Sequence, residues 1–166
     1  EQTDINEVWF VVSPQNPLKE KKGLLADYHR LAMVNIAVED DARMRSCNIE
    51  FKMPQPSYTI DTLAYLGEKY PDRDFVLIGG TDILPTFHKW KNYKVLLENH
   101  KLFIYNRPGY EAGEYKEHPN ISFFQAPLLE ISASFIRNAI KKGRDIKYML
   151  PPKVYEYIRE MHFYEK

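Results

Sequence analysis

The sequence predicts an α/β fold with a doubly wound, mainly parallel sheet. Short and largely apolar runs occur at residues 7–12, 74–78, 101–105 and 121–124, and strands buried on both faces of a sheet have this composition. Segments with helical periodicity separate these runs along the chain. Strands that alternate with helices indicate a parallel sheet, because a helical crossover lets the next strand start at the same end.

In the first half of the chain, each element follows from its local pattern. A helix is predicted over about 24–39, where apolar residues recur at helical spacing. Residues 43–51 are predicted to be extended, with Met44 facing the core. The proline-rich stretch 54–56 interrupts this pattern, and we expect a helix from there to about residue 69.

The second half is predicted to hold four helical segments besides its strands. Short helical turns are expected over 83–90 and 93–98. After the last strand, a helix is predicted over 133–142, since Gly143 follows it and helices commonly end at glycine. A final helix is predicted near 152–161, because proline suits its first turn.

The composition indicates one globular domain, spanning residues 1–166, and is compatible with a small anionic ligand. Hydrophobic residues make up 44% and charged residues 28% of the chain, which is ordinary for a globular protein. Basic and acidic residues number 23 each, so the formal net charge is zero, whereas nucleic-acid-binding proteins usually carry a basic excess. No apolar run approaches the roughly 20 residues that cross a bilayer. We therefore expect neither a nucleic acid nor a membrane as partner.

Cysteine and histidine usage argues against a disulfide and a metal centre. Cys47 is the only cysteine, so no internal disulfide can form and a cytoplasmic location is expected. The five histidines lack the spacing of paired metal ligands, and no cysteine pair accompanies them. We therefore expect no metal ligands among the protein's side chains.

The strongest functional motif lies at the start of the helix predicted over 133–142. Ser132, Ser134 and Arg137 bring two hydroxyls and a guanidinium to a helix N-terminus, where unpaired N–H groups and a partial positive charge favour anions. This pattern predicts a polyphosphate site. The ordinary alternative is that Ser132 only caps the helix.

Polar residues also follow the other predicted strands. Lys19 comes after the first run, Gly80 and Asp82 after the second, and Arg107 after the third. Ligands of open parallel sheets bind beyond the carboxyl ends of the strands, so these residues are candidates for one site. Each also has an ordinary explanation, in which Gly80 turns the chain, Asp82 caps a helix and Arg107 pairs on the surface.

Two aromatic residues suggest a pocket that selects the substrate. Tyr58 and Thr59 stand at a predicted helix N-terminus, whose N–H groups could bind a carboxylate. Trp90 lies in the polar context His88-Lys89-Trp90-Lys91, where an aromatic cation such as a pyridinium would cover its indole. The alternative is that Trp90 packs against the core.

These motifs resemble those of the nicotinate-nucleotide adenylyltransferases, a family of the nucleotidyltransferase α/β superfamily with a Rossmann-like fold. The resemblance covers nearly the whole chain, and its most specific parts are Ser-Tyr-Thr and Ile-Ser-x-Ser-x-Ile-Arg. The matching stretches are residues 7–10, 13–17, 56–63, 80–82, 90, 107–110 and 131–137.

The resemblance implies a transferase of NAD biosynthesis that moves the adenylyl group of ATP to nicotinate mononucleotide and releases deamido-NAD and pyrophosphate. On this basis Gly80 and Asp82 are expected at the ATP ribose. Ser132, Ser134 and Arg137 are expected at the triphosphate, with Ser134 and Arg137 acting in catalysis. Mg²⁺ is the implied cofactor, held mainly through the phosphates of ATP.

The resemblance also implies a site for the mononucleotide. The residues expected around it are Lys19, Tyr58, Thr59, Trp90, Lys91 and Arg107. Within this set, the Trp90 ring is expected to stack on the nicotinate ring. The backbone N–H groups of Thr59 and Lys91 are expected to bind the nicotinate carboxylate.

One family feature has no counterpart in this chain. Members of the family begin with a buried strand and a His-x-Gly-His loop, and residues 1–12 contain no such motif. The missing strand, loop and helix would add about 20 to 25 residues. We therefore expect the sequence to be N-terminally incomplete, to lack the central strand of the sheet, and to be impaired in folding and catalysis as it stands.

Three other functions stay open at this point. A sister adenylyltransferase with a different acceptor would not need the pocket of Tyr58, Thr59 and Trp90. A noncatalytic nucleotide-binding module is compatible with the missing histidines. An assembly protein could use some of the 12 tyrosines and 9 phenylalanines as an interface.

Overall fold

The computed structural model describes residues 3–15 and 24–165. Contacts between Cα atoms group these residues into two compact units. The central unit comprises Ile49–Leu128 with residues 14 and 15, and the terminal unit comprises residues 3–13, 24–48 and 129–165. That both units form a single nucleotidyltransferase domain stays a prediction.

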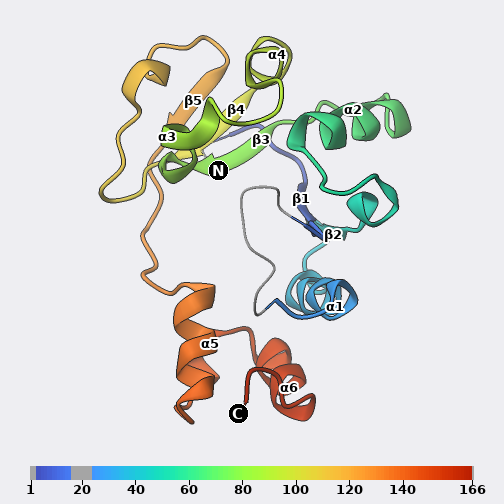
Figure 1. Ribbon diagram of the computed structural model, residues 1–166, viewed down its shortest axis with the longest axis vertical. Coiled ribbons are helices and arrows are strands. Elements are labelled where there is room, and N and C mark those ends of the chain that lie inside the picture. The colour runs from blue at the N-terminus through green and yellow to red at the C-terminus, as the bar shows by residue number, and fades with distance from the viewer. Residues whose placement is uncertain (1–2, 16–23, 166) are drawn as a thin grey trace. The chain divides into compact units, whose positions relative to one another are not determined.

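A three-stranded parallel sheet forms the centre of the central unit (Figure 1). The strands are β3 (Leu77–Gly80), β4 (Leu102–Tyr105) and β5 (Ile121–Phe124), in the order β3-β4-β5. Leu77 lies opposite Leu102, which in turn lies opposite Ile121. Because the strands are parallel and in register, their carboxyl ends reach the same edge of the sheet.

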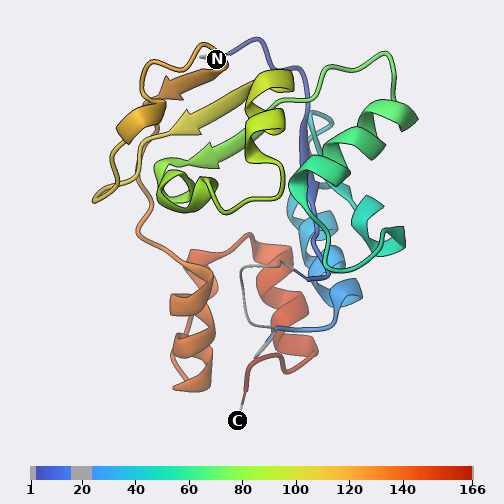
Figure 2. The same ribbon diagram turned by 45° about the horizontal axis from the view of Figure 1, so that its top comes forward.

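Two helices, α3 (Leu84–Phe87) and α4 (Tyr93–Asn99), pack on one face of this sheet (Figure 2). The helix α2 (Thr59–Lys69) lies beside the sheet and contributes Leu63 to the same core. Three short 3₁₀ turns accompany them, namely η1 (Ile49–Lys52), η2 (Thr81–Ile83) and η3 (Gly113–Tyr115). The turn η2 follows β3 directly, so residues 81–83 start at the carboxyl end of the strand.

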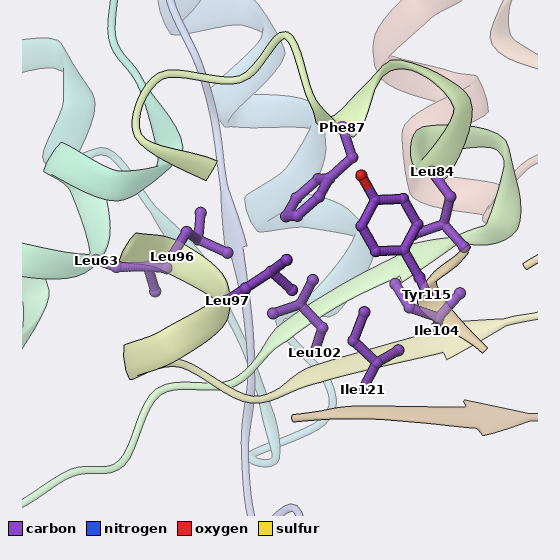
Figure 3. Packing of buried hydrophobic residues seen from close by; sticks show 9 residues of the cluster. All are labelled: Leu63, Leu84, Phe87, Leu96, Leu97, Leu102, Ile104, Tyr115 and Ile121. Carbon is purple, nitrogen blue, oxygen red and sulfur yellow. The ribbon is translucent and has the colours of Figure 1, made fainter. Parts of the chain in front are cut away.

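The hydrophobic core of the central unit lies between these helices and the sheet (Figure 3). Leu102 and Ile104 alternate along β4 and are fully buried on the same face, where Phe87 and Leu96 pack against them. The ring of Phe87 meets the edge of Tyr115 at a centroid distance of 5.7 Å. Each such side chain contributes about 1.5–3 kcal/mol on burial, so this core holds β3, β4 and the helices in place.

The terminal unit contains a second parallel pair of strands. These are β1 (Val8–Val11) and β2 (Met44–Cys47), and they are joined by α1 (Asp27–Val38). The unit also contains α5 (Ala133–Lys141), η4 (Lys147–Met149) and α6 (Pro152–Glu160). Met33 and Ile36 of α1 pack against a cluster built on Val154, Ile158 and Phe163.

The α/β fold with parallel strands is confirmed, since every described strand pair is parallel. Within the described residues the five strands belong to two sheets. The predicted strand at 74–78 is shifted to Leu77–Gly80, because Gly79 and Gly80 adopt extended backbone and pair with β4. The glycine pair therefore belongs to the strand, and the chain turns only after it.

The prediction that residues 43–51 are extended throughout is wrong at its end. Residues 49–52 form the turn η1, and consecutive side chains Ile49 and Glu50 are both buried. A strand would point neighbouring side chains to opposite faces, so it could not bury both on one side. Met44, expected to face the core, is 39% exposed.

Among the described residues, none of the helices has the length and apolar character required to cross a membrane.

Candidate active site

The carboxyl ends of β3 and β4 bring Gly80, Asp82 and Arg107 together. The Arg107 guanidinium lies 3.3 Å from the Asp82 carboxylate and donates a hydrogen bond of 3.0 Å to the Tyr105 hydroxyl. The hydrogen bond and charge of Tyr105, followed by the charge of Asp82, raise the pKa of Arg107 above its ordinary value. Both members of the ion pair are partly exposed, so the pair is weak, about 0–1 kcal/mol.

Gly80 leaves the space in which these two side chains meet. A Cβ atom at this position would lie 2.5 Å from Asp82 Oδ1 and 2.9 Å from Arg107 Nε. Both distances are far shorter than an ordinary van der Waals contact. Any larger residue at this position would displace the ion pair. The close approach of side chains, rather than a turn, is therefore what favours glycine here.

Thr81 is a residue of this cluster that the sequence analysis missed. It is 1% exposed, and its hydroxyl accepts a hydrogen bond of 2.9 Å from the backbone N–H of Arg107. This bond ties the end of β3 to the end of β4. The sequence offered one indication of this role, namely the position of Thr81 between Gly80 and Asp82 in a predicted site. A threonine at such a position can be buried and bind the backbone instead of a ligand.

The first turn of α2 carries a second cluster of predicted residues. Tyr58 is the N-cap, Thr59 is the first helical residue, and the Tyr58 side chain makes no capping hydrogen bond. The ammonium of Lys91 lies 4.9 Å from the centre of the Tyr58 ring and 2.7 Å from the Asp61 carboxylate. The pair of Lys91 and Asp61 therefore connects the loop after Trp90 to α2.

The sequence analysis also missed a buried carboxylate that is hydrogen-bonded to this turn. Glu50 is 7% exposed, and its two oxygens accept hydrogen bonds from the hydroxyls of Ser57 and Thr62 at 2.5 and 2.8 Å. No motif of the sequence marked Glu50, since it stands in a segment that was predicted to be extended.

Trp90 lies against the core, partly buried. Its indole and the Phe87 ring have centroids 5.1 Å apart, and it packs against the central-unit core cluster. One part of the Trp90 side chain therefore packs against the core, as the alternative explanation predicted. Stacking of its remaining surface on a nicotinate ring stays a prediction.

The predicted triphosphate residues lie together in the terminal unit. Ser132 is the N-cap of α5, and its hydroxyl accepts a hydrogen bond of 3.1 Å from the backbone N–H of Phe135. The Arg137 guanidinium donates to the Ser134 hydroxyl at 3.1 Å. Ser132 thus caps the helix, as its ordinary explanation required. Lys19 lies outside the described residues.

Each of these clusters, taken by itself, offers donors that suit an anionic group. In the central unit these are the Arg107 guanidinium and the uncapped N-terminus of α2, and in the terminal unit they are the Arg137 guanidinium and the serine hydroxyls. Over residues 3–15 and 24–165, no three His, Cys, Asp or Glu side chains gather closely enough to hold a metal ion. Parallel strands that end in such groups define an α/β protein of the nucleotide-binding class.

Comparison with known proteins gives the family. The model of the cytidylyltransferase-like family matches residues 1–139. The match covers most of the chain, so this protein belongs to the cytidylyltransferase-like family.

Curated relatives cover almost the whole chain. A protein of Flavobacterium johnsoniae, named "Probable nicotinate-nucleotide adenylyltransferase", is 52% identical over 165 residues, which are 98% of this chain and 86% of that protein. A protein of the same name from Bacteroides thetaiotaomicron is 43% identical over 96% of this chain and 79% of its own length.

A solved structure shares the fold. The nicotinic acid mononucleotide adenylyltransferase of Plasmodium falciparum, complexed with NaAD, has a TM-score of 0.77 over 96% of this chain and 82% of its own. Its sequence identity to this chain is 22%.

Proposed function

We propose that this protein transfers the adenylyl group of ATP to nicotinate mononucleotide, giving deamido-NAD and pyrophosphate, in the biosynthesis of NAD. The observation that carries this function is the identity of 52% with a relative of that name over 98% of the chain. The clusters at Arg107 and Tyr58 support it, because they provide donors for an anionic nucleotide.

On the ATP side, we assign the ribose to Asp82, with Gly80 giving it room. The Asp82 carboxylate can accept hydrogen bonds from ribose hydroxyls once its weak pair with Arg107 opens. We assign the triphosphate to Ser132, Ser134 and Arg137. Arg137 and Ser134 already share a hydrogen bond, so a phosphate oxygen could take donors from both.

On the acceptor side, we assign the nicotinate ring to Trp90 and its carboxylate to the N–H groups of Thr59 and Lys91. Thr59 is the first residue of a helix whose N-cap side chain leaves the first-turn donors unoccupied. Tyr58 and Arg107 line the mononucleotide, and Lys19 completes the set by resemblance. Lys91 and Asp61 keep the two donor segments in contact.

The reaction needs positioning and charge stabilisation more than proton transfer. An oxygen of the mononucleotide phosphate attacks the α-phosphorus of ATP, and a P–O bond forms as the bond to the bridging oxygen of the β-phosphate breaks. The pyrophosphate leaves with the electron pair of that bond. The nucleophile is already an anion, so no strong general base is required, and cationic side chains such as Arg137 stabilise the charge that develops.

The donor set fits a Mg²⁺ ion that is held by the substrate. The protein offers hydroxyls and guanidinium groups at the proposed triphosphate site, and no cluster of carboxylates is present among the described residues. Mg²⁺ prefers phosphate oxygens and water in such sites, and when bound it neutralises triphosphate charge. Ser132 and Ser134 are the residues near which it would be held.

Pyrophosphate release from ATP tests this function directly. The native gene product should form deamido-NAD with nicotinate mononucleotide and turn over the amide analogue much more slowly, since backbone donors lose their carboxylate partner. Equal rates would favour an acceptor range broader than the acid. Tight ATP binding in calorimetry without turnover of either acceptor would instead indicate a noncatalytic module.

A further inference from the structure

Glu50 places a carboxyl group in the buried interior of the central unit. It is 7% exposed, and its hydrogen-bond partners Ser57 and Thr62 are each 5% exposed. Over the described residues, no lysine, arginine or histidine forms an ion pair with it. Burying a carboxylate without a cation is costly unless hydrogen bonds occupy its oxygens. Two hydroxyls do so here, one on each oxygen.

The two hydroxyls stand on either side of the segment that carries the proposed carboxylate donors. Ser57 directly precedes the N-cap Tyr58, and Thr62 lies at the end of the first turn of α2, where its N–H bonds to the carbonyl of Tyr58 at 3.0 Å. The N–H of Thr59 therefore belongs to a stretch of backbone fixed at both ends to one side chain.

The turn η1, which carries Glu50, is held by a further side-chain hydrogen bond. The side-chain amide of Gln55 donates to the backbone carbonyl of Glu50 at 2.8 Å. Two hydrogen bonds of the Glu50 carboxylate thus join the turn η1 to the start of α2, and the bond from Gln55 holds η1 to the loop that follows it. A cluster of this kind makes one backbone conformation much more favourable than its neighbours.

We propose that Glu50 is a positioning residue for recognition of the acceptor, which it serves by holding Ser57 and Thr62 so that the N–H of Thr59 points to the substrate carboxylate. This role rests on the proposed function. Glu50 does not act through its charge on the acceptor, because a negative charge near a bound carboxylate would weaken binding. Its effect is on the direction of donors, and misplacement by about 1 Å can cost up to 10²-fold in rate.

Thr62 offers a matched pair of variants. Thr62→Val keeps the shape of the side chain and removes its hydroxyl, while Thr62→Ser keeps the hydroxyl. We expect Thr62→Val and Glu50→Ala to raise the KM for nicotinate mononucleotide about 5- to 20-fold and to leave the KM for ATP within about twofold. Thr62→Ser should be close to the wild type in both.

Asn120→Ala controls for a loss of stability alone. Asn120 donates to the carbonyl of Leu97 at 2.7 Å in the same unit, and its truncation removes a hydrogen bond that is not attached to α2. This variant should lower Tm and leave the acceptor KM unchanged. A rise of both KM values together in Thr62→Val, or an equal rise of acceptor KM in Asn120→Ala, would mean that Glu50 only stabilises the fold.

Glu50→Gln separates position from charge. Glutamine retains one acceptor oxygen, so we expect an acceptor KM between those of the wild type and Glu50→Ala. A KM below the wild-type value would overturn the proposal, since removal of the charge would then be what matters.

Hydrogen exchange gives a readout that needs no activity. Backbone amides of residues 57–63 should exchange faster in Thr62→Val than in Thr62→Ser, and equal rates would refute the positioning role. If the wild-type protein does not adenylylate nicotinate mononucleotide at all, the proposed function fails, while this exchange comparison still decides whether Glu50 fixes the turn.

Discussion

Replacement of Gly80 by alanine tests the geometry at the ends of β3 and β4. The new Cβ would lie 2.5 Å from Asp82 Oδ1, 2.9 Å from Arg107 Nε and 3.0 Å from Arg107 Cδ. Ordinary contacts of this kind begin near 3.4 Å. The Asp82 carboxylate must therefore move by about 1 Å, and Arg107 must move with it.

The expected effect on activity is larger than the effect on stability. A displacement of about 1 Å in a positioning group can cost up to 10²-fold, so we expect kcat/KM for ATP to fall about 10- to 100-fold. Both side chains are flexible and partly exposed, so their displacement costs only about the lower end of the range for overpacking, about 1 kcal/mol, and the stiffer unfolded chain returns up to about 1 kcal/mol. The net loss of at most about 1 kcal/mol lowers Tm by at most about 4 °C for a chain of this size.

Gly67→Ala is the matched control, because a Cβ at Gly67 meets no atom within 4 Å. Gly67 lies in α2, where alanine is favoured by about 1 kcal/mol over glycine, so Tm should rise by about 2–4 °C with unchanged kinetics. Pyrophosphate release at 25 °C and thermal melts measure both variants. Wild-type kinetics in Gly80→Ala would refute the assignment of Asp82 and Arg107 to substrate binding.

Three further predictions concern the terminal unit. His162 has φ of 51° at the end of α6, so His162→Gly should raise Tm by about 2–4 °C, whereas Gly143→Ala, at φ of 67°, should lower it by a similar amount. Hydrogen bonds from Arg43 lower the pKa of Asp41 from 3.8 to about 2. Their contribution to stability is complete above pH 3.8 and is lost as pH falls through 2. In an NMR titration, Asp41 of the Arg43→Ala variant should therefore have a midpoint nearer 3.8. Ser132→Ala should lower the free energy of unfolding by about 1 kcal/mol through loss of the helix cap. Ser132→Asp should restore Tm but not ATP affinity, because aspartate caps a helix but repels a triphosphate. Recovery of both Tm and ATP affinity would contradict a role for Ser132 at the triphosphate.

The sequence was informative where one periodic pattern decided the structure. The strand at Ile121–Phe124 was predicted with its observed bounds, and the helix Thr59–Lys69 was predicted with its observed end. Prediction was wrong at residues 49–51, because a buried acid in a turn has no periodic signature. The extension of β3 through Gly79 and Gly80 was also missed, since glycine is rare in strands and pairing with β4 decided the outcome.

Within the candidate site, the sequence predicted the partly exposed charged side chains and not the buried residues that hold them. Motifs marked Asp82 and Arg107, and the structure brings them within 3.3 Å although they are 25 residues apart in sequence. Motifs did not mark Thr81 as an anchor or Glu50 as a partner of α2. Their roles depend on burial and on contacts between distant segments, which local patterns do not contain.

The two clusters of the central unit share one construction. In each, a buried hydroxyl or carboxylate fixes backbone, as Thr81 fixes the N–H of Arg107 and Glu50 fixes the start of α2. In each, the charged side chains form a partly exposed ion pair, between Asp82 and Arg107 or between Lys91 and Asp61.

The difference between the buried hydrogen bonds and the partly exposed ion pairs has a consequence for ligand binding. An exposed pair contributes only about 0–1 kcal/mol, so a substrate that offers better partners can open it at little cost. A buried hydrogen bond leaves an unsatisfied group when it breaks, at about 1–3 kcal/mol, so the backbone donors keep their places during that exchange. The charged side chains Asp82 and Arg107, which the motifs identified, can therefore change partners, while Thr81 and Glu50, which they did not identify, keep the backbone in place.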